Sequence, residues 1–516
     1  MSLFARKPID VLLNEAKAEG AGTLKRTLGA GNLIALGIGA IIGAGLFVRT
    51  AAAAANHAGP SVTIGFIVAA IGCAFAGLCY AEFASMIPVA GSAYTYSYAT
   101  MGEFIAWIIG WDLILEYGVG AATVGIAWSE YFNRLLGMFG EGWRIPYEWI
   151  HSPFEKDPAT GVHGIINIPA LFIILLLTLV LIRGTKGSAN LNSFIVILKV
   201  AIVLIFIAIG WSYIRPENHT PFIPEPGKYT NSQGITTNFG GILGILGAAG
   251  VVFFAFIGFD AVSTAAQEAK NPGKDMPIGI LGSLAICTVL YILFSYVLTG
   301  VASTEDFRTH GREASVAYAV DHMAGSTVNG EWVPKFGWLS DAITIAILAG
   351  FSSVILVMLL GQSRVFYSMS RDGLLPKVFS DVHPKFRTPY KANWIIFLIC
   401  GAFAGFVPGD IVGEMTSIGT LFAFILVCAG VWIMRIKHPE ILRGFKTPAV
   451  GFVAIMGILV CTAMIFGLGW TNWLRLGGWL VIGLVIYFAY SKSHSKLAHG
   501  QVVSPKDPVD PLNPVQ

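Results

Sequence analysis

Long runs of apolar residues decide the fold class of this chain. A helix needs about 20 mostly apolar residues to cross the roughly 30 Å hydrocarbon core of a bilayer. Backbone polar groups cannot stay unpaired in lipid, so each such run is expected to be helical. The sequence therefore predicts an all-α polytopic membrane protein with 12 transmembrane helices, at approximately 30–55, 61–86, 98–130, 165–183, 190–213, 239–268, 279–303, 338–370, 392–408, 411–435, 449–469 and 472–491.

Composition supports the membrane assignment and excludes several classes of protein. Hydrophobic residues make up 55% of the chain and charged residues 12%, whereas soluble domains are about 25% charged. The net charge of +3 is too small to indicate binding to nucleic acid. The six cysteines all lie in apolar runs without the spacing of metal ligands, so we expect them to be buried. No cofactor and no metal are expected.

The distribution of lysine and arginine predicts the orientation. Cytoplasmic loops carry an excess of these residues. If the N-terminus is inside, 22 of the 33 basic residues fall on the inner side, in tails and loops. The sequence therefore predicts a multi-pass protein of the plasma membrane with both termini in the cytoplasm.

Two of the apolar runs are interrupted by glycine and polar residues at mid-membrane depth. The stretch GIGAIIGAGLFV (residues 37–48) lies in the first span, and GAAGVVFFAFIGFDAVSTAAQE (residues 247–268) lies in the sixth. Interrupted helices at matching places in two halves indicate an inverted repeat with a substrate site between its copies. The alternative is close helix packing, because Gly39 and Gly43 form a GxxxG pair.

An offset of five spans between the interruptions predicts two repeats of five helices each. An odd number of spans per repeat inverts the second copy. The expected organisation is a cytoplasmic tail (1–28), a first repeat (29–213), a second repeat (239–435), two appended helices (449–491) and a second cytoplasmic tail (492–516).

Interrupted helices can bind a zwitterion without charged side chains. Unwinding frees N–H groups at the start of one half-helix and carbonyl groups at the end of the other. The first end carries partial positive charge and the second partial negative charge. An α-amino acid presents a carboxylate and an ammonium group a few ångströms apart, so its head group fits such a break.

Several stretches of the chain make it resemble a known family. They include LKRTLGAGNLIALGIGAIIGAGLFV, YAEFASMIPVAGSAYTYSYATMGE, GWDLILEYGVGAA, FFAFIGFDAVSTAAQEAKNPGKDMPIGI, GQSRVFYSMSRDGLLPKVFSDVHPKFRTPYKAN and SIGTLFAFILVCAGVWIMR. The sequence resembles the amino acid–polyamine–organocation (APC) superfamily, and most closely the bacterial members of the cationic amino acid transporter family. The resemblance implies the five-plus-five inverted-repeat fold named for a bacterial leucine transporter, and secondary amino-acid transport, often coupled to protons.

The resemblance also implies which backbone groups bind the substrate. N–H groups at Ala44 and Gly45, with Gly43 beside them, would bind the carboxylate. The carbonyl of Ile41 would accept the ammonium group, helped by carbonyls near Phe254, Ala255 and Ile257. Phe254 would act as an aromatic gate, while packing is the alternative role for the phenylalanines of this stretch.

Lys199 is the clearest candidate for ion coupling. It lies midway along the apolar run NLNSFIVILKVAIVLIFIAIG, where a charge costs roughly 3 kcal/mol and is a functional hypothesis by default. In the related fold, a lysine on span 5 of some proton-driven transporters takes the place of a sodium ion between spans 1 and 8, and Lys199 matches that position. The alternative is a lysine that snorkels to the interface.

Acidic residues within the spans are further candidates. Asp112 and Glu116 are four residues apart and share a helix face. Glu116 and Asp260 are expected either to exchange protons or to have a structural role. Glu82 and Glu268 lie nearer the cytoplasmic ends, where we expect them to pair with loop arginines such as Arg364.

The function predicted from these features is secondary active transport of L-amino acids by alternating access, coupled to protons and with neutral or broad specificity. Cationic substrates, exchange and sodium symport remain alternatives within this class. Outside it, an ion channel is the rival, whereas no HExxH or GxSxG motif favours an enzyme. The partners expected are an amino acid, the proton and membrane lipid, and a small membrane subunit stays open.

Overall fold

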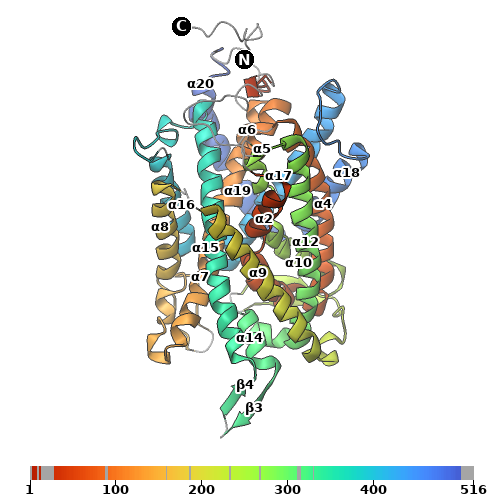
Figure 1. The fold of residues 1–516 in the computed structure, drawn as a ribbon, viewed down its shortest axis with the longest axis vertical. Coiled ribbons are helices and arrows are strands. Elements are labelled where there is room, and N and C mark those ends of the chain that lie inside the picture. The colour runs from red at the N-terminus through yellow and green to blue at the C-terminus, as the bar shows by residue number, and fades with distance from the viewer. Residues whose placement is uncertain are drawn as a thin grey trace.

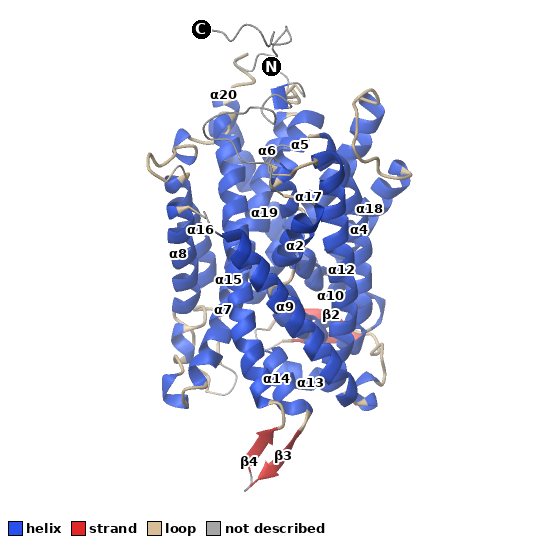
Figure 2. Cartoon of the chain, viewed as in Figure 1, coloured by secondary structure: helices blue, strands red, loops and turns tan. Residues whose placement is uncertain are grey.

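The computed structural model is an elongated bundle of helices that run along its long axis (Figure 1). It describes residues 3–8, 11–12, 28–87, 91–157, 160–184, 188–231, 234–266, 269–310, 315–328, 331–386 and 388–500. Figure 2 shows that strands are confined to short hairpins in the lower part of this view, with the β3–β4 hairpin projecting from the end opposite α20.

Helices follow one another along almost the whole described chain. The first half contains α2 (Ala30–Ile41), η1 (Gly45–Arg49), α3 (Thr50–Ala53), η2 (Ala54–Ala58), α4 (Val62–Met86), α5 (Ser92–Thr100), α6 (Glu103–Leu113), η4 (Ile114–Val119), α7 (Gly120–Gly137), α8 (Ile168–Arg183) and α9 (Ser188–Gly210). The second half contains α10 (Gly241–Val252), η9 (Phe253–Phe256), α11 (Ala261–Thr264), α12 (Pro272–Val301), α13 (Thr304–His310), α14 (Ser315–Met323), α15 (Gly337–Arg371), α16 (Tyr390–Phe406), α17 (Gly409–Lys437), α18 (Val450–Gly467), α19 (Trp470–Ile486), η12 (Tyr487–Ser491) and α20 (Lys492–His494).

Many of these helices have the length and composition of membrane spans. Within the described ranges, 9 helical stretches are long and apolar enough to cross a bilayer, and three shorter apolar helices are Ala30–Ile41, Ile168–Arg183 and Tyr390–Phe406. The prediction of a helical polytopic membrane protein is confirmed, and the count of twelve spans stays a prediction. All six cysteines are buried and free, as expected.

Two antiparallel hairpins lie between helices. Strand β1 (Gly227–Thr230) pairs with β2 (Thr236–Phe239), and β3 (Gly325–Val328) pairs with β4 (Glu331–Pro334). The first hairpin is fixed to the end of η2, because the Thr237 hydroxyl donates to the carbonyl of Asn56 at 2.7 Å and the Gly240 N–H donates to that of His57 at 2.7 Å.

The two ends of the described chain meet at the opposite end of the bundle. The ammonium of Lys7 lies 3.0 Å from the carboxylate of Asp372, which also accepts a hydrogen bond from the Tyr94 hydroxyl at 2.7 Å. The backbone N–H of Lys496 donates to the carbonyl of Asp372 at 3.1 Å. Residues near both ends therefore share one anchor in the loop after α15.

Glu103, at the start of α6, is a second buried anchor at this end. Its carboxylate accepts hydrogen bonds from the hydroxyls of Tyr98 at 2.9 Å and Tyr487 at 3.2 Å, and from Ser495. The carboxylate is thus satisfied by groups from both halves of the chain.

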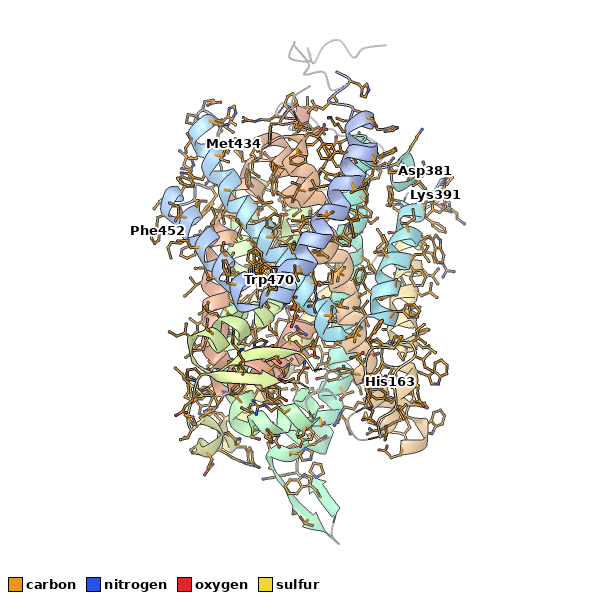
Figure 3. The ribbon with its side chains drawn as sticks, turned by 180° about the vertical axis from the view of Figure 1, so that it is seen from behind. His163, Asp381, Lys391, Met434, Phe452 and Trp470 are labelled. Atoms are coloured by element: carbon orange, nitrogen blue, oxygen red, sulfur yellow. The ribbon has the colours of Figure 1, made fainter. Side chains whose placement is uncertain are left out.

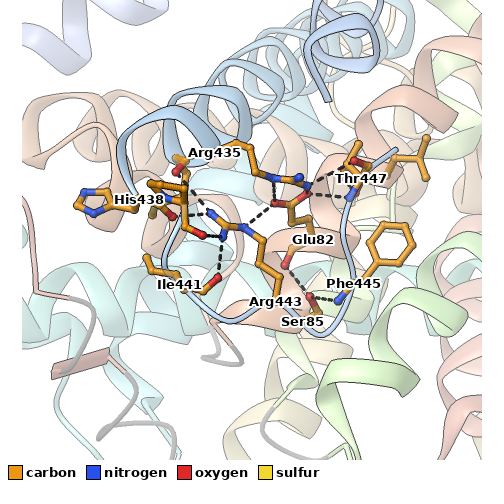
Figure 4. A network of polar contacts seen from close by, with 11 residues as sticks. Glu82, Ser85, Arg435, His438, Ile441, Arg443, Phe445 and Thr447 are labelled. Atoms are coloured by element: carbon orange, nitrogen blue, oxygen red, sulfur yellow. Dashed lines mark hydrogen bonds and ion pairs between the residues drawn. The ribbon is translucent and has the colours of Figure 1, made fainter. Parts of the chain in front are cut away.

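Glu82 near the end of α4 pairs with arginines, as expected, but with others than the one named; Glu268 lies outside the described residues. The Glu82 carboxylate binds Arg435 at 2.6 Å and Arg443 at 3.0 Å, and accepts the backbone N–H of Thr447 at 2.8 Å (Figure 4). Arg364, the partner named in the sequence analysis, instead donates to the carbonyl of Thr264 at 3.4 Å. Spacing along the chain could not identify these partners, because Arg435 lies near the end of α17 and Arg443 and Thr447 lie in the loop that follows it.

Candidate substrate site

The first broken segment comprises residues 30–58. Helix α2 ends at Ile41, and Ile42 is extended, with ψ of 104°. Helical structure begins again at Ala44 and continues as the π-helical η1. The carbonyls at the end of α2 and the N–H groups at the start of the outer half therefore point into the interruption.

The second broken segment comprises residues 241–264. Helix α10 gives way to the 3-10 turn η9, after which Ile257 is extended with ψ of 133°. Gly258 has φ of 116°, a conformation that side chains disfavour. A methyl group there would lie 2.9 Å from the backbone of Ala40, so only glycine fits.

The two interruptions lie directly against each other. A methyl group added to Gly45 would overlap the Cα atom of Ala255. Glycine at this position lets the two backbones approach to a distance that a side chain would prevent. The predicted substrate-binding positions Ala44, Gly45 and Ala255 are thus brought to one place, although they come from different parts of the chain.

Tyr291 on α12 bridges the two breaks. Its hydroxyl oxygen lies 3.0 Å from the carbonyl oxygen of Ile41 and 2.9 Å from that of Ala255. A hydroxyl has one proton, so the two carbonyls share it. The sequence analysis missed this residue, because nothing in the apolar run around it distinguishes a bridging tyrosine from a packed one.

Lys199 reaches the end of the first half-helix. Its ammonium donates to the carbonyls of Gly39 at 2.8 Å and Ile42 at 2.9 Å, and only 1% of the residue is exposed. Gly350 on α15 makes room for it, since a methyl group there would lie 2.7 Å from the lysine Cε. The ammonium thus occupies the end of α2 that carries partial negative charge.

The acidic candidates form a separate group. Glu116, in the π-helical η4, and Asp260, just after the second break, are fully buried and close enough to interact. The Tyr117 hydroxyl donates to Asp260. Asp112 is also fully buried, and its carboxyl oxygens have no hydrogen-bond partner among the residues that the structure describes.

Phe254, the predicted gate, is buried beside the break. Its neighbours Phe253 and Phe259 both pack on Phe424, and Phe256 packs on Tyr291. Packing therefore accounts for these three rings.

A cavity of about 90 Å³ reaches Ala44 from the end of the bundle that carries β1 and β2. Val48, Thr123, Ile126 and Ala127 line it together with charged residues, among them Arg49, Glu130, Glu155, Arg308 and Asp410. The guanidinium of Arg49 pairs with Asp410 at 2.9 Å. Glu116 is not part of this lining.

Comparison with known proteins decides the family. A family model described as amino acid permease matches residues 28–487. This chain belongs to the amino acid permease family. It is 44% identical over 496 residues to the branched-chain amino acid permease BcaP of Bacillus subtilis (strain 168), covering 96% of this permease and 99% of the relative.

Other relatives of this permease are named for different substrates. It is 40% identical over 498 residues to the methylthioribose transporter of Bacillus subtilis (strain 168), with 96% and 99% of the two chains covered. It is 32% identical over 448 residues to cationic amino acid transporter 4, vacuolar, of Arabidopsis thaliana, covering 85% of this permease and 68% of the relative. The resemblance to the APC superfamily is thereby confirmed.

The permease therefore presents two groups of buried polar atoms, one at each of its broken segments. One group is Lys199 with the carbonyls of α2, and the other is Glu116 with Asp260 and Tyr117. Among the described residues, none of the hydrogen bonds made by the Lys199 ammonium goes to an acidic side chain.

Proposed function

We propose that this permease is a secondary active transporter that moves neutral L-amino acids across the plasma membrane by alternating access, coupled to protons. Its twelve spans would form a five-plus-five inverted repeat (29–213 and 239–435) followed by two helices, with both termini cytoplasmic. The observation that carries the proposal is the contact of the two broken segments at Gly45 and Ala255.

The broken segments suit the head group of an amino acid. N–H groups at Ala44 and Gly45 would donate to its carboxylate, with Gly43 giving the backbone freedom. Carbonyls of Ile41, Phe254, Ala255 and Ile257 would accept from its ammonium. Helix ends provide such partial charges without a charged side chain, and Phe254 would cover the bound substrate.

The apolar part of the cavity wall supports neutral substrates. On this part the cavity that reaches Ala44 is lined by Val48, Ile126 and Ala127, and a charge buried against them without a partner costs several kcal/mol or more. The 44% identical relative is named for branched-chain amino acids, which have side chains of this kind.

Cationic amino acids are the second candidate. Glu130 and Glu155 also line the cavity, and either carboxylate could hold a lysine or arginine side chain. The plant relatives named as cationic amino acid transporters agree with this alternative. Glu116 would contribute less, because it does not line the cavity.

Proton coupling would depend on Lys199. As an ammonium, it neutralises the end of α2 and ties α9 to the first broken segment through Gly39 and Ile42. Loss of its proton would remove the charge, weaken both hydrogen bonds and allow α2 to move away. Proton binding would then favour one orientation of the substrate site, and proton release the other.

Glu116 and Asp260 would form a second proton-exchanging group. Two buried carboxyl groups this close cannot both be ionised without a large electrostatic cost. One proton shared between them would be lost or gained as α11 moves relative to η4.

Uptake by purified permease in proteoliposomes tests the function. A labelled branched-chain amino acid should accumulate under an inward proton gradient, and competition by all twenty amino acids at two pH values should rank neutral aliphatic ones first. Strong competition by lysine and arginine would favour the second candidate. Accumulation that requires sodium, or flux without accumulation, would contradict proton symport.

A further inference from the structure

We propose that the loop between α17 and α18, residues 438–449, binds the headgroups of anionic phospholipids in the inner leaflet. It joins two helices that are apolar enough to cross a membrane, Gly409–Lys437 and Val450–Gly467, so both of its ends lie at a membrane surface. Its assignment to the inner leaflet rests on the orientation proposed above.

The outer side of this loop combines apolar side chains with lysines. Leu442 is 93% exposed, and the helix residues on either side of the loop include Ile436 at 67% and Phe452 at 61%. Figure 3 shows Phe452 at the outer edge of the bundle. Lys437 and Lys446 are exposed beside them, and neither has an ion-pair partner within the described ranges. Apolar side chains can enter the acyl boundary while lysines remain at the headgroups.

The charge of this region suits phosphate groups. Arg435 and Arg443 share one carboxylate, that of Glu82. Glu440, the one acid within the loop, pairs with His438 at 3.1 Å. Four basic residues at 435–446 therefore face two acids, and the excess positive charge attracts anionic lipid.

The inner side of the loop is fixed to the helices that surround it. The side chain of Arg443 is 1% exposed where it contacts Glu82 of α4, and the Phe445 N–H donates to the Ser85 hydroxyl at 3.1 Å (Figure 4). Gly444 packs on Gly273, at the start of α12, where a methyl group on Gly444 would lie 2.5 Å from the Gly273 Cα. A lipid bound outside the loop would thus stabilise the positions of α4, α12 and α17 together.

Thermal unfolding in defined lipid tests this proposal without depending on transport. Purified permease is placed in mixed micelles that contain either phosphatidylcholine or phosphatidylglycerol at equal total lipid. The melting temperature should be higher with phosphatidylglycerol. The double variant K437Q/K446Q should lose most of this difference, and native mass spectrometry should find less phosphatidylglycerol retained on it.

The matched control is K377Q/K385Q, which removes the same charge from exposed lysines in the loop after α15. It should keep the lipid difference of the wild type. Equal melting temperatures of the wild type in both lipids, or an equal loss in the control, would overturn the proposal. So would inorganic phosphate that reproduced the effect of the lipid, because a soluble anion would then be the ligand.

Discussion

The ammonium of Lys199 lies 2.9 Å from the carbonyl oxygen of Ile42, the residue at which the first helix unwinds. A cation from α9 thus occupies the position where the broken segment exposes its negative end. This hydrogen bond joins the lysine to the proposed substrate site through one stretch of backbone. A change in the protonation of Lys199 would therefore alter the backbone at the substrate site, and substrate binding would alter the surroundings of Lys199.

Replacement of Lys199 by alanine should abolish proton-driven accumulation. Without the ammonium, the carbonyls of Gly39 and Ile42 lose their buried partner. The measurement is uptake into proteoliposomes under an imposed pH gradient. Wild-type accumulation by Lys199→Ala would refute the role given to this residue. Lys199→Arg keeps the charge but cannot release a proton, so it should retain substrate binding and lose accumulation.

Gly45→Ala should abolish uptake, because the added methyl group would overlap the backbone of Ala255 and separate the two broken segments. Gly31→Ala, on the other half-helix of the same broken segment, is the matched control, since nothing lies within 4 Å of its added methyl group. Uptake and melting temperature should both fall in the first variant and stay near wild type in the second. Normal uptake by Gly45→Ala would disprove the close contact.

Ala44→Leu should block substrate binding. The larger side chain would fill part of the cavity that Ala44 lines and keep a carboxylate away from the adjacent N–H groups. Binding of a labelled amino acid, measured by scintillation proximity, is the readout. Ala402→Leu, at an exposed position of α16, is the control and should bind normally. Unchanged affinity in Ala44→Leu would place the carboxylate elsewhere.

Tyr291→Phe should weaken both stability and substrate affinity. It removes the hydroxyl that the carbonyls of Ile41 and Ala255 share, and an unsatisfied buried acceptor costs about 1–3 kcal/mol. The melting temperature and the dissociation constant should both change. Tyr296→Phe on the same helix is the control and should leave both near wild type. Identical behaviour of the two variants would show that the bridge contributes nothing.

The sequence contained strong signals for part of this architecture. Apolar runs predict helices because lipid forces backbone groups to pair internally, and the helical polytopic class is confirmed. Glycine at residues 43 and 45 stands out because helix interiors disfavour it, and the structure interrupts the helix at residues 42 and 43. Lys199 stands out because charge is rare in such a run.

Other parts of the site carried no local signal. Tyr291 contacts residues that are 250 and 36 positions away, and Arg435 and Arg443 reach Glu82 across more than 350 positions. Such pairs depend on how helices cross in three dimensions, which periodicity along one helix does not encode. Glu116 lies in the π-helical η4, a stretch of 6 residues between α6 and α7, which the apolar pattern predicted as part of one continuous span.

Glu103 gives this fold an order of assembly. Its partners Tyr487 and Ser495 follow it by 384 and 392 positions, so they leave the ribosome long after α6 has been inserted. Until then the Glu103 carboxylate lacks two of the three hydroxyl groups that donate hydrogen bonds to it. This end of the bundle can therefore be completed only after the last helices have been made. A chain that ends too early would keep a buried Glu103 carboxylate without two of its hydrogen-bond donors, and such a defect would mark it for degradation by quality-control proteases.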